Sequence, residues 1–392
     1  MLSVLSRARK SLGRIAVGLT ALALAACQPV GESSTGGPAI DRSAPVPVAL
    51  LVPGGSGQAS DELLARSLQN AARLAISDLG AVKIDLRVYN TAGQPAQAQA
   101  MAIKAMDEGA MIILGPVFAQ EANAAGVAAA PRGVNVLAFS NNPDIAGGNV
   151  FILGPTFDNT AARLARYSVK NGKGRVMIVH DQNTAGLLGR AAIERGVASA
   201  GGSVVSVGSY PFSQNGVLDA APRIAAAARS NSADALFLTA DTAGALPLIS
   251  QLLADSGMGP AAIQFIGLTR WDIPQANLGL PGVQGAWFAM PDPALYQQYQ
   301  TRYQTAFGEA PHPISGLAYD GIAAIGALVK QGKARALSGA ALSQGAGFVG
   351  VNGIFRLRGD GQNERGLAVA QIRNNQVVII DPAPRSFGGA GF

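Results

Sequence analysis

The chain has little of what would define a chemistry directly: it contains one cysteine, two histidines and no long apolar run after residue 26. A single thiol excludes a disulfide within the chain. His180 and His312 lie far apart in the sequence, so the clustered ligands of a zinc site are missing. The lack of a later apolar run predicts that nothing beyond the N-terminal stretch spans a membrane.

Nucleic acid is not an expected partner, although the formal net charge is +6 and the isoelectric point is about 9.6. Four of the 30 basic residues precede Cys27 and no acidic residue does, so 26 basic and 24 acidic residues follow. Basic residues also do not cluster with aromatic ones after Cys27. The remaining chain is therefore nearly neutral, which gives no electrostatic reason to bind a polyanion.

The N-terminal stretch has the pattern of a lipoprotein signal. Basic residues from Arg7 to Arg14 precede an apolar run, Ile15–Ala26, which is too short to cross a bilayer of about 20 residues. Leu24-Ala25-Ala26-Cys27 resembles a bacterial lipobox. The resemblance implies that residues 1–26 are removed and that acylated Cys27 anchors the chain in a membrane. A plain secretory signal with an incidental cysteine is the alternative.

The residue after the lipobox bears on which membrane holds the anchor. In bacteria that use an aspartate at this position to retain lipoproteins in the inner membrane, Gln28 favours the outer membrane of a Gram-negative cell. Residues 27–47 are rich in glycine, serine and proline, and predict a flexible tether. The chain that follows exceeds the size at which one hydrophobic core stops growing, so we expect two lobes.

Short apolar runs alternate with longer amphipathic stretches along this chain. The spacing predicts a doubly wound α/β fold with mostly parallel sheets, in which ligands bind beyond the carboxyl ends of the strands. A hairpin is expected near the C-terminus, between 353–357 and 367–373, across Asp360-Gly361. The other predicted strands are 48–52, 84–89, 111–114, 134–139, 175–180, 203–207, 235–239, 264–267 and 285–289.

A set of short motifs carries a resemblance to a known family. These motifs are Ala49-Leu50-Leu51-Val52-Pro53, Val88-Tyr89-Asn90-Thr91, Ile112-Ile113-Leu114-Gly115-Pro116, Phe151-Ile152-Leu153-Gly154-Pro155, Val176-Met177-Ile178-Val179-His180-Asp181 and Ala318-Tyr319-Asp320-Gly321. In this order they resemble the leucine-binding-protein-like type I periplasmic binding proteins, over residues 46–385. The resemblance implies two lobes that close on a ligand, joined by crossovers near 154–158, 288–292 and 342–351. Lobe one would hold 46–156 plus 291–343, and lobe two 157–289 plus 348–385.

The resemblance implies a binding protein and not an enzyme. Such a protein would hold a small molecule, an amino acid or a related compound, and deliver it to an ABC permease. The residues agree, because no Gly-x-Ser-x-Gly nucleophile turn is present and Gly54-Gly55-Ser56-Gly57 lacks the ending of a phosphate-binding loop. No cofactor is expected.

A second resemblance leaves another function open. The stretch from Asn135 to Pro143, and Arg365 ahead of a strand, are similar to the C-terminal domain of penicillin-binding-protein activator lipoproteins. That similarity implies an interaction protein that regulates peptidoglycan synthesis by contact with a penicillin-binding protein.

In lobe one, the candidate ligand-binding residues follow two predicted strands. In the amino-acid binders that the chain resembles, a hydroxyl and backbone amides in the first of these loops hold a ligand carboxylate. Here Val117 and Phe118 occupy that place, which weakens carboxylate capture. Ser140, Asn141 and Asn142 end the next strand, where they either donate to a ligand or cap the following turn.

In lobe two, candidate residues occupy the equivalent loops: Gln182, Asn183, Thr184, Asp241, Thr269, Arg270 and Trp271. Asp241 would suit a ligand ammonium or cap a helix. Arg270 would meet a carboxylate or pair with Asp272. Trp271 would either cover the ligand or pack inside the lobe.

Overall fold

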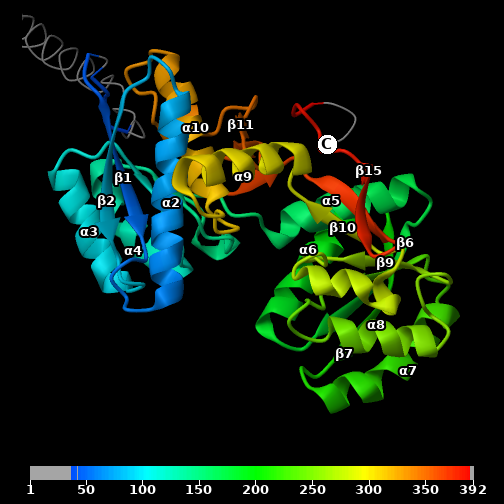
Figure 1. The fold of residues 1–392 in the computed structure, drawn as a ribbon. Helices are drawn as coiled ribbons and strands as arrows, with labels where there is room; N and C mark the ends of the chain where they lie inside the picture. The colour runs from blue at the N-terminus through cyan, green and yellow to red at the C-terminus, as the bar shows by residue number, and fades with distance from the viewer. Residues whose placement is uncertain (1–36, 42, 389–392) are drawn as a thin grey trace, which may run out of the picture.

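Alternating apolar strands and amphipathic helices build two separate parallel sheets (Figure 1). The computed structural model describes residues 37–41 and 43–388. It confirms the predicted α/β fold with helices on both faces of mostly parallel sheets. Cys27 and the signal segment lie outside the described residues.

Lobe one contains a five-stranded parallel sheet in the order β2-β1-β3-β4-β5. Its strands are β1 (Val46–Val52), β2 (Ile84–Asn90), β3 (Ile112–Leu114), β4 (Val136–Ala138) and β5 (Val150–Ile152). Its helices are α2 (Ala59–Asp78), α3 (Pro95–Asp107), α4 (Ala119–Ala129), α9 (Pro293–Phe307), α10 (Gly316–Lys330) and α11 (Gly339–Leu342).

Strand β1 shows why both faces of this sheet must be covered. Val48, Leu50 and Val52 enter one core with α2 and α10, whereas Ala49 and Leu51 enter a second core with α3 and α4. Successive residues of a strand face opposite sides of a sheet, so a continuous apolar run needs helices on both faces. Helices α2 and α10 lie side by side on the first face (Figure 1).

Lobe two contains a seven-stranded sheet in the order β15-β14-β10-β9-β8-β6-β7. Its strands are β6 (Arg175–Asp181), β7 (Ser203–Tyr210), β8 (Ala235–Leu238), β9 (Gln264–Gly267), β10 (Trp287–Met290), β14 (Ala368–Arg373) and β15 (Gln376–Asp381). Its helices are α5 (Phe157–Lys170), α6 (Thr184–Ser199), α7 (Gln214–Ser230) and α8 (Leu246–Asp255). Strands β14 and β15 are antiparallel to their neighbours, and the other pairs are parallel.

The same alternation covers the second sheet. Met177 and Val179 of β6 enter a core with α7 and α8, and Val176 and Ile178 enter one with α5 and α6. Helix α5 lies between β5, the last strand of the lobe-one sheet, and β6, the first strand of the lobe-two sheet along the chain. Thr156 begins it by accepting a hydrogen bond from Asn159 N, and the helix covers β10 and β14.

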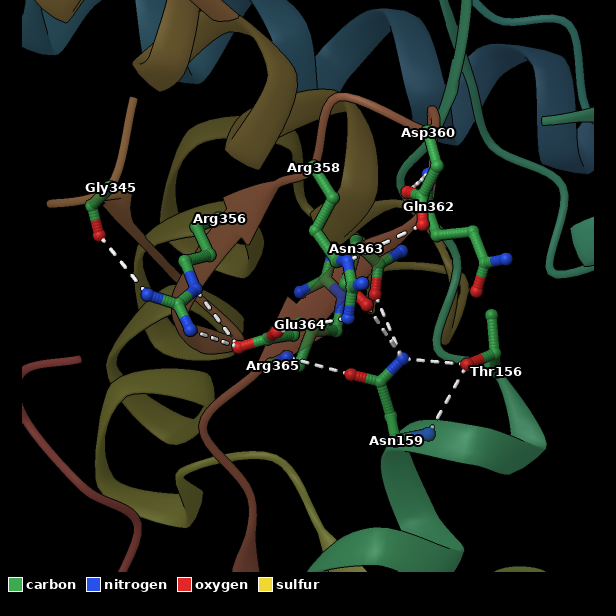
Figure 2. Close-up of polar contacts among 10 residues, drawn as sticks. All are labelled: Thr156, Asn159, Gly345, Arg356, Arg358, Asp360, Gln362, Asn363, Glu364 and Arg365. Carbon is green, nitrogen blue, oxygen red and sulfur yellow. Dashed lines mark hydrogen bonds and ion pairs between the residues drawn. The ribbon is translucent and has the colours of Figure 1, made fainter. Parts of the chain in front are cut away.

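The C-terminal hairpin prediction is wrong. Strand β12 (Gly353–Leu357) pairs with β13 (Asn363–Arg365), and β14 pairs instead with β10 and β15. Residues 363–365 are polar and lack the apolar alternation of a strand, so β13 was not predicted from the sequence. Hydrogen bonds to distant residues hold the strand in place. Asn363 Nδ2 donates to Ile152 O at 2.8 Å. Asn159 Oδ1 accepts from Arg365 N at 2.7 Å (Figure 2).

This small sheet also changes the lobe boundary. Strand β11 (Phe348–Gly350) pairs with β12, and Phe348, Phe355 and Leu357 enter the lobe-one core. Leu367 is the first residue after β13 that enters a lobe-two core. The third crossover therefore lies after Leu357, later than the predicted 342–351, because the three-stranded sheet buries its aromatic side chains against lobe one.

The tether prediction fails for its last residues. Ile40 is only 6% exposed within the lobe-one core, and its N–H donates to Ala334 O at 2.9 Å. Strand β1 begins at Val46, which is 3% exposed. The folded domain therefore begins before residue 47. These two apolar anchors were not predicted because the segment around them is rich in glycine, serine and proline. Within residues 37–41 and 43–388, no helix is long and apolar enough to cross a membrane.

A buried ion pair joins the segments between the lobes. Asp320 on α10 is fully buried and accepts from Val351 N at 2.8 Å and from Arg365 Nη1 at 3.1 Å. Arg365 in turn donates through Nε and Nη2 to Leu153 O, at the end of lobe one's sheet. Asn352 Nδ2 completes the carboxylate's shell at 3.0 Å. One charge pair thus links the first and third crossovers.

Replacement of Asp320 by asparagine is expected to lower the free energy of unfolding by about 3 kcal/mol, because it leaves the Arg365 charge buried without compensation. Urea denaturation followed by circular dichroism measures this. The matched control is Glu309→Gln, which breaks the exposed Arg66–Glu309 pair and should cost less than about 1 kcal/mol. Equal effects of the two substitutions would contradict the role given to Asp320.

Candidate functional site

A cavity of about 290 Å³ lies between the two lobes in the described chain, beside the crossovers. Lobe two contributes the start of α5 and the segments that follow β9 and β10. Lobe one contributes the start of α10 with the loop before it. The lining residues are Pro155, Thr156, Phe157, Thr160, Leu268, Thr269, Arg270, Ile273, Ala289, Met290, Pro291, Pro313, Ile314, Leu317, Asn352, Arg365 and Leu367.

The wall of this cavity is mainly apolar. Phe157, Leu268 and Met290 come from lobe two, and Ile314 and Leu317 face them from lobe one. No aspartate or glutamate is among the described residues that line it. A mostly apolar hollow with few polar groups suits a small organic molecule whose orientation those groups decide.

Thr269 supplies an unused hydrogen-bonding group in this wall. Its Oγ1 is buried and has no partner among the described residues. A buried hydroxyl without a partner costs free energy, and such groups in folded proteins usually have a reason. A ligand that hydrogen-bonds to this hydroxyl would remove the cost.

Arg270 and Trp271 are both held within lobe two. Arg270 Nε donates to Asp272 Oδ1 at 2.6 Å, which is the pairing considered in the sequence. Trp271 is fully buried and donates from Nε1 to Ala240 O at 3.2 Å. The indole lies against Gly267, where any larger side chain would collide with it. Arg270 therefore lines the cavity, whereas Trp271 packs inside the lobe.

The lobe-one candidates lie outside the cavity lining. Phe118 precedes α4 with its side chain 41% exposed, and Val117 packs against the lobe-one core. Ser140 is buried, and its Oγ accepts from Asn142 N at 3.1 Å. Asn142 caps the short turn that follows, and Asn141 is exposed.

The remaining lobe-two candidates follow their strands, as predicted, but they too are absent from the cavity lining. Asn183 caps α6 by accepting from Gly186 N at 2.7 Å. Gln182 donates to Ser209 Oγ, and Thr184 is the exposed first residue of α6. Asp241 is exposed and makes its contacts through its backbone carbonyl. Of the predicted residues, the structure thus brings only Thr269 and Arg270 into the cavity.

Most of the cavity wall was not proposed from the sequence. The first two predicted crossovers contain Thr156, Phe157, Met290 and Pro291, but no ligand-binding role was predicted for these residues. Ile314 and Asn352 come from distant segments, which meet only through the tertiary fold. A crossover in a two-lobed protein borders the space between the lobes, and the predicted crossovers contain six of the 17 lining residues.

A buried acid was also missed. Glu121, in the first turn of α4, is fully buried and neither carboxylate oxygen has a hydrogen-bond partner among the described residues. Burial raises the pKa of Glu121, and the nearby Thr91 hydroxyl and Phe118 amide oppose that rise only in part. Histidine, cysteine and acidic side chains form no cluster able to hold a metal in residues 37–41 and 43–388.

The comparisons with known proteins define the class. The sequence profile of the periplasmic binding protein family matches residues 45–376, which is most of the chain. The chain therefore belongs to the periplasmic binding protein family. No curated protein matches it significantly.

Solved structures share the fold at low sequence identity. A candidate branched-chain amino acid ABC transporter protein from Rhodospirillum rubrum is 19% identical, with a TM-score of 0.73 over 86% of this chain and 100% of that one. A substrate-binding protein from Desulfitobacterium hafniense in complex with leucine is 17% identical, with a TM-score of 0.63 over 86% and 100%. A solute-binding protein from Rhodopseudomonas palustris in complex with benzoate is 18% identical, with a TM-score of 0.57 over 89% and 99%.

Glu121→Gln is expected to stabilise the fold increasingly as the pH rises. The folded pKa of Glu121 lies above the unfolded one, so the folded chain keeps its proton while the unfolded chain loses it. Wild-type stability relative to Glu121→Gln should therefore fall as the pH rises through the unfolded pKa, and level off above the folded one.

Urea denaturation of both chains across that range of pH tests this. Glu309→Gln, at an exposed site, serves as the control and should show no such trend. A wild-type chain that gains stability over Glu121→Gln on going from acid to neutral pH would contradict the direction of the shift.

Proposed function

We propose that this protein is a solute-binding lipoprotein of the bacterial cell envelope, which binds one small molecule between its lobes for uptake by an ABC-type transporter. The cavity of about 290 Å³ beside the crossovers is the observation that carries the proposal. It is lined from both lobes, so a ligand there contacts both. A ligand that binds one arrangement of the lobes more tightly shifts the protein toward that arrangement. The permease would then recognise the closed, ligand-bound protein.

The lining favours a ligand with an apolar body and a hydrogen-bonding or carboxylate end. The apolar wall suits an aliphatic or aromatic group, and the unused Thr269 hydroxyl can donate to a ligand oxygen. Arg270 adds positive charge, shared with Asp272. No acidic side chain of the described chain lines the cavity to meet an ammonium, so the lining suits a simple organic acid better than a zwitterionic amino acid.

The proposal includes the lipid anchor on Cys27. Acylation there would hold the folded domain near the membrane in the periplasm, in the outer membrane if Gln28 follows the sorting rule described above.

Cys27→Ser is expected to abolish labelling of the protein with palmitate, because no acyl chain can then be attached. Labelling of cells with palmitate, followed by fractionation, measures acylation of the membrane-bound protein. The control, Ser33→Ala, lies close to the anchor and should keep both label and membrane association. A Cys27→Ser chain that still takes up the label would contradict the anchor.

A second candidate function is regulation of a penicillin-binding protein by direct contact. It is favoured by the exposed Phe118 side chain, because the resemblance puts Val117 or Phe118 where amino-acid binders present a hydroxyl. A surface aromatic suits a protein partner better than a ligand carboxylate. Under this alternative the interlobe cavity would remain empty.

Thermal-shift and calorimetric titrations with leucine, benzoate and related acids distinguish the two functions. A ligand at 100 times its Kd adds about 2.7 kcal/mol to the stability of the native state. Thr269→Val should weaken the binding of that ligand about fivefold to tenfold, through the loss of one hydrogen bond.

Thr301→Val is the matched control, because it removes the same hydroxyl from exposed helix α9. It should leave the affinity unchanged. Equal losses in both variants would contradict the cavity assignment. The second function would be favoured by two results together. No compound would shift the melting temperature, and a penicillin-binding protein would be retained by wild type but not by Phe118→Ala.

A further inference from the structure

A second cavity shares Arg365 with the first one and is otherwise lined by different residues. Its volume is about 250 Å³, and its lining comes from α5 in lobe two and from the β12–β13 segment attached to lobe one. Arg365 borders both cavities, but its guanidinium is already engaged by Asp320 and Leu153 O. The second cavity is therefore separate from the proposed ligand site.

Charge distinguishes this cavity from the apolar one. Four arginines line it, Arg163, Arg166, Arg358 and Arg365, against two carboxylates. Both carboxylates are shared with arginines outside the lining. Asp158 pairs with Arg195 at 2.8 Å, and Glu364 pairs with Arg356 at 2.6 Å. The lining thus holds more positive charge than its own acids neutralise.

Arg166 is the arginine whose charge is not matched. Arg163 pairs with Asp381 at 2.6 Å, and Arg358 reaches Glu364 at 3.3 Å. The half-buried Arg166 makes only a bond from Nε to Ala162 O, within its own helix, and forms no ion pair with any described residue. Burial, and then the nearby Arg163 charge, lower the pKa of Arg166. Both effects mean that an anion beside it would be favourable.

The neighbouring side chains are already ordered around this space. Figure 2 shows Glu364 between Arg356 and Arg358, and Asn159 reaching from α5 to Asn363 and Arg365. Asn159 Nδ2 donates to Asn363 Oδ1 at 3.0 Å, across the junction of the lobes. A site whose walls are held by such bonds needs little rearrangement to accept a ligand.

We propose that this cavity binds a small tetrahedral oxyanion, of the phosphate or sulfate type, held by Arg166 from α5 and Arg358 from the segment after β12. Guanidinium groups present paired N–H donors that match the oxygens of such an anion. The terminal nitrogens of Arg166 donate to no other described residue. An anion held from both sides would bridge lobe two to lobe one.

Titration of the full chain with inorganic phosphate tests the site, with sodium chloride exchanged so that the ionic strength stays constant. Wild type is expected to gain thermal stability with phosphate and to bind it measurably by calorimetry. Arg166→Gln should weaken phosphate binding about tenfold or more, because it removes a charge-assisted hydrogen bond.

Arg73→Gln is the control, since it removes the same charge from the exposed face of α2. It should leave phosphate binding unchanged. Should Arg166→Gln fail to fold by circular dichroism, Arg358→Gln carries the test, because the Arg358 side chain is 53% exposed and tolerates replacement. Equal phosphate affinity in wild type and the folded cavity variant would overturn the proposal. So would a wild-type response no larger than that to sodium chloride.

Discussion

The buried pair of Asp320 and Arg365 is the constraint on which the arrangement of the two lobes depends. Asp320 belongs to a helix of the lobe-one core, and Arg365 ends the last strand before the chain enters lobe two. Two charges taken out of water are stable only if their remaining hydrogen bonds are made, and here Val351, Asn352 and Leu153 make them. The pair therefore fixes where the crossovers run, and hence where the space between the lobes lies.

The two sides of this junction differ in chemistry. On one side, apolar residues from both lobes surround a cavity in which Thr269 has an unused hydroxyl. On the other side, arginines dominate a polar cavity bounded by α5 and the β12–β13 segment. A molecule with an apolar body is thus favoured in the first cavity, and a small inorganic anion in the second. Both places touch segments of both lobes, so occupancy at either one bears on how the lobes are held.

The sequence predicted the fold well where burial alone decides structure. Runs such as 48–52 and 176–179 are apolar throughout, which is typical of strands covered on both faces. It failed at β13, because Asn363 and Arg365 are held by hydrogen bonds to distant residues and not by apolar contacts. It also failed for the chain before β1, where Ile40 anchors a segment of loop-like composition.

The sequence predicted the binding site less well than the fold, for a similar reason. Polar residues after strands, such as Ser140 and Asn183, were marked as candidates, and the structure shows them bonded to nearby backbone amides. Local capping and ligand binding use the same residue types, so sequence position alone cannot separate them.

The most direct test of the account is whether a molecule occupies the interlobe cavity. Native mass spectrometry of the detergent-solubilised protein, purified from its own cells or after addition of leucine or benzoate, measures this. The account predicts one small molecule bound per chain, and its loss when Thr160→Trp fills the cavity from α5. The same bound mass in both proteins, or none in either under every condition, would contradict it.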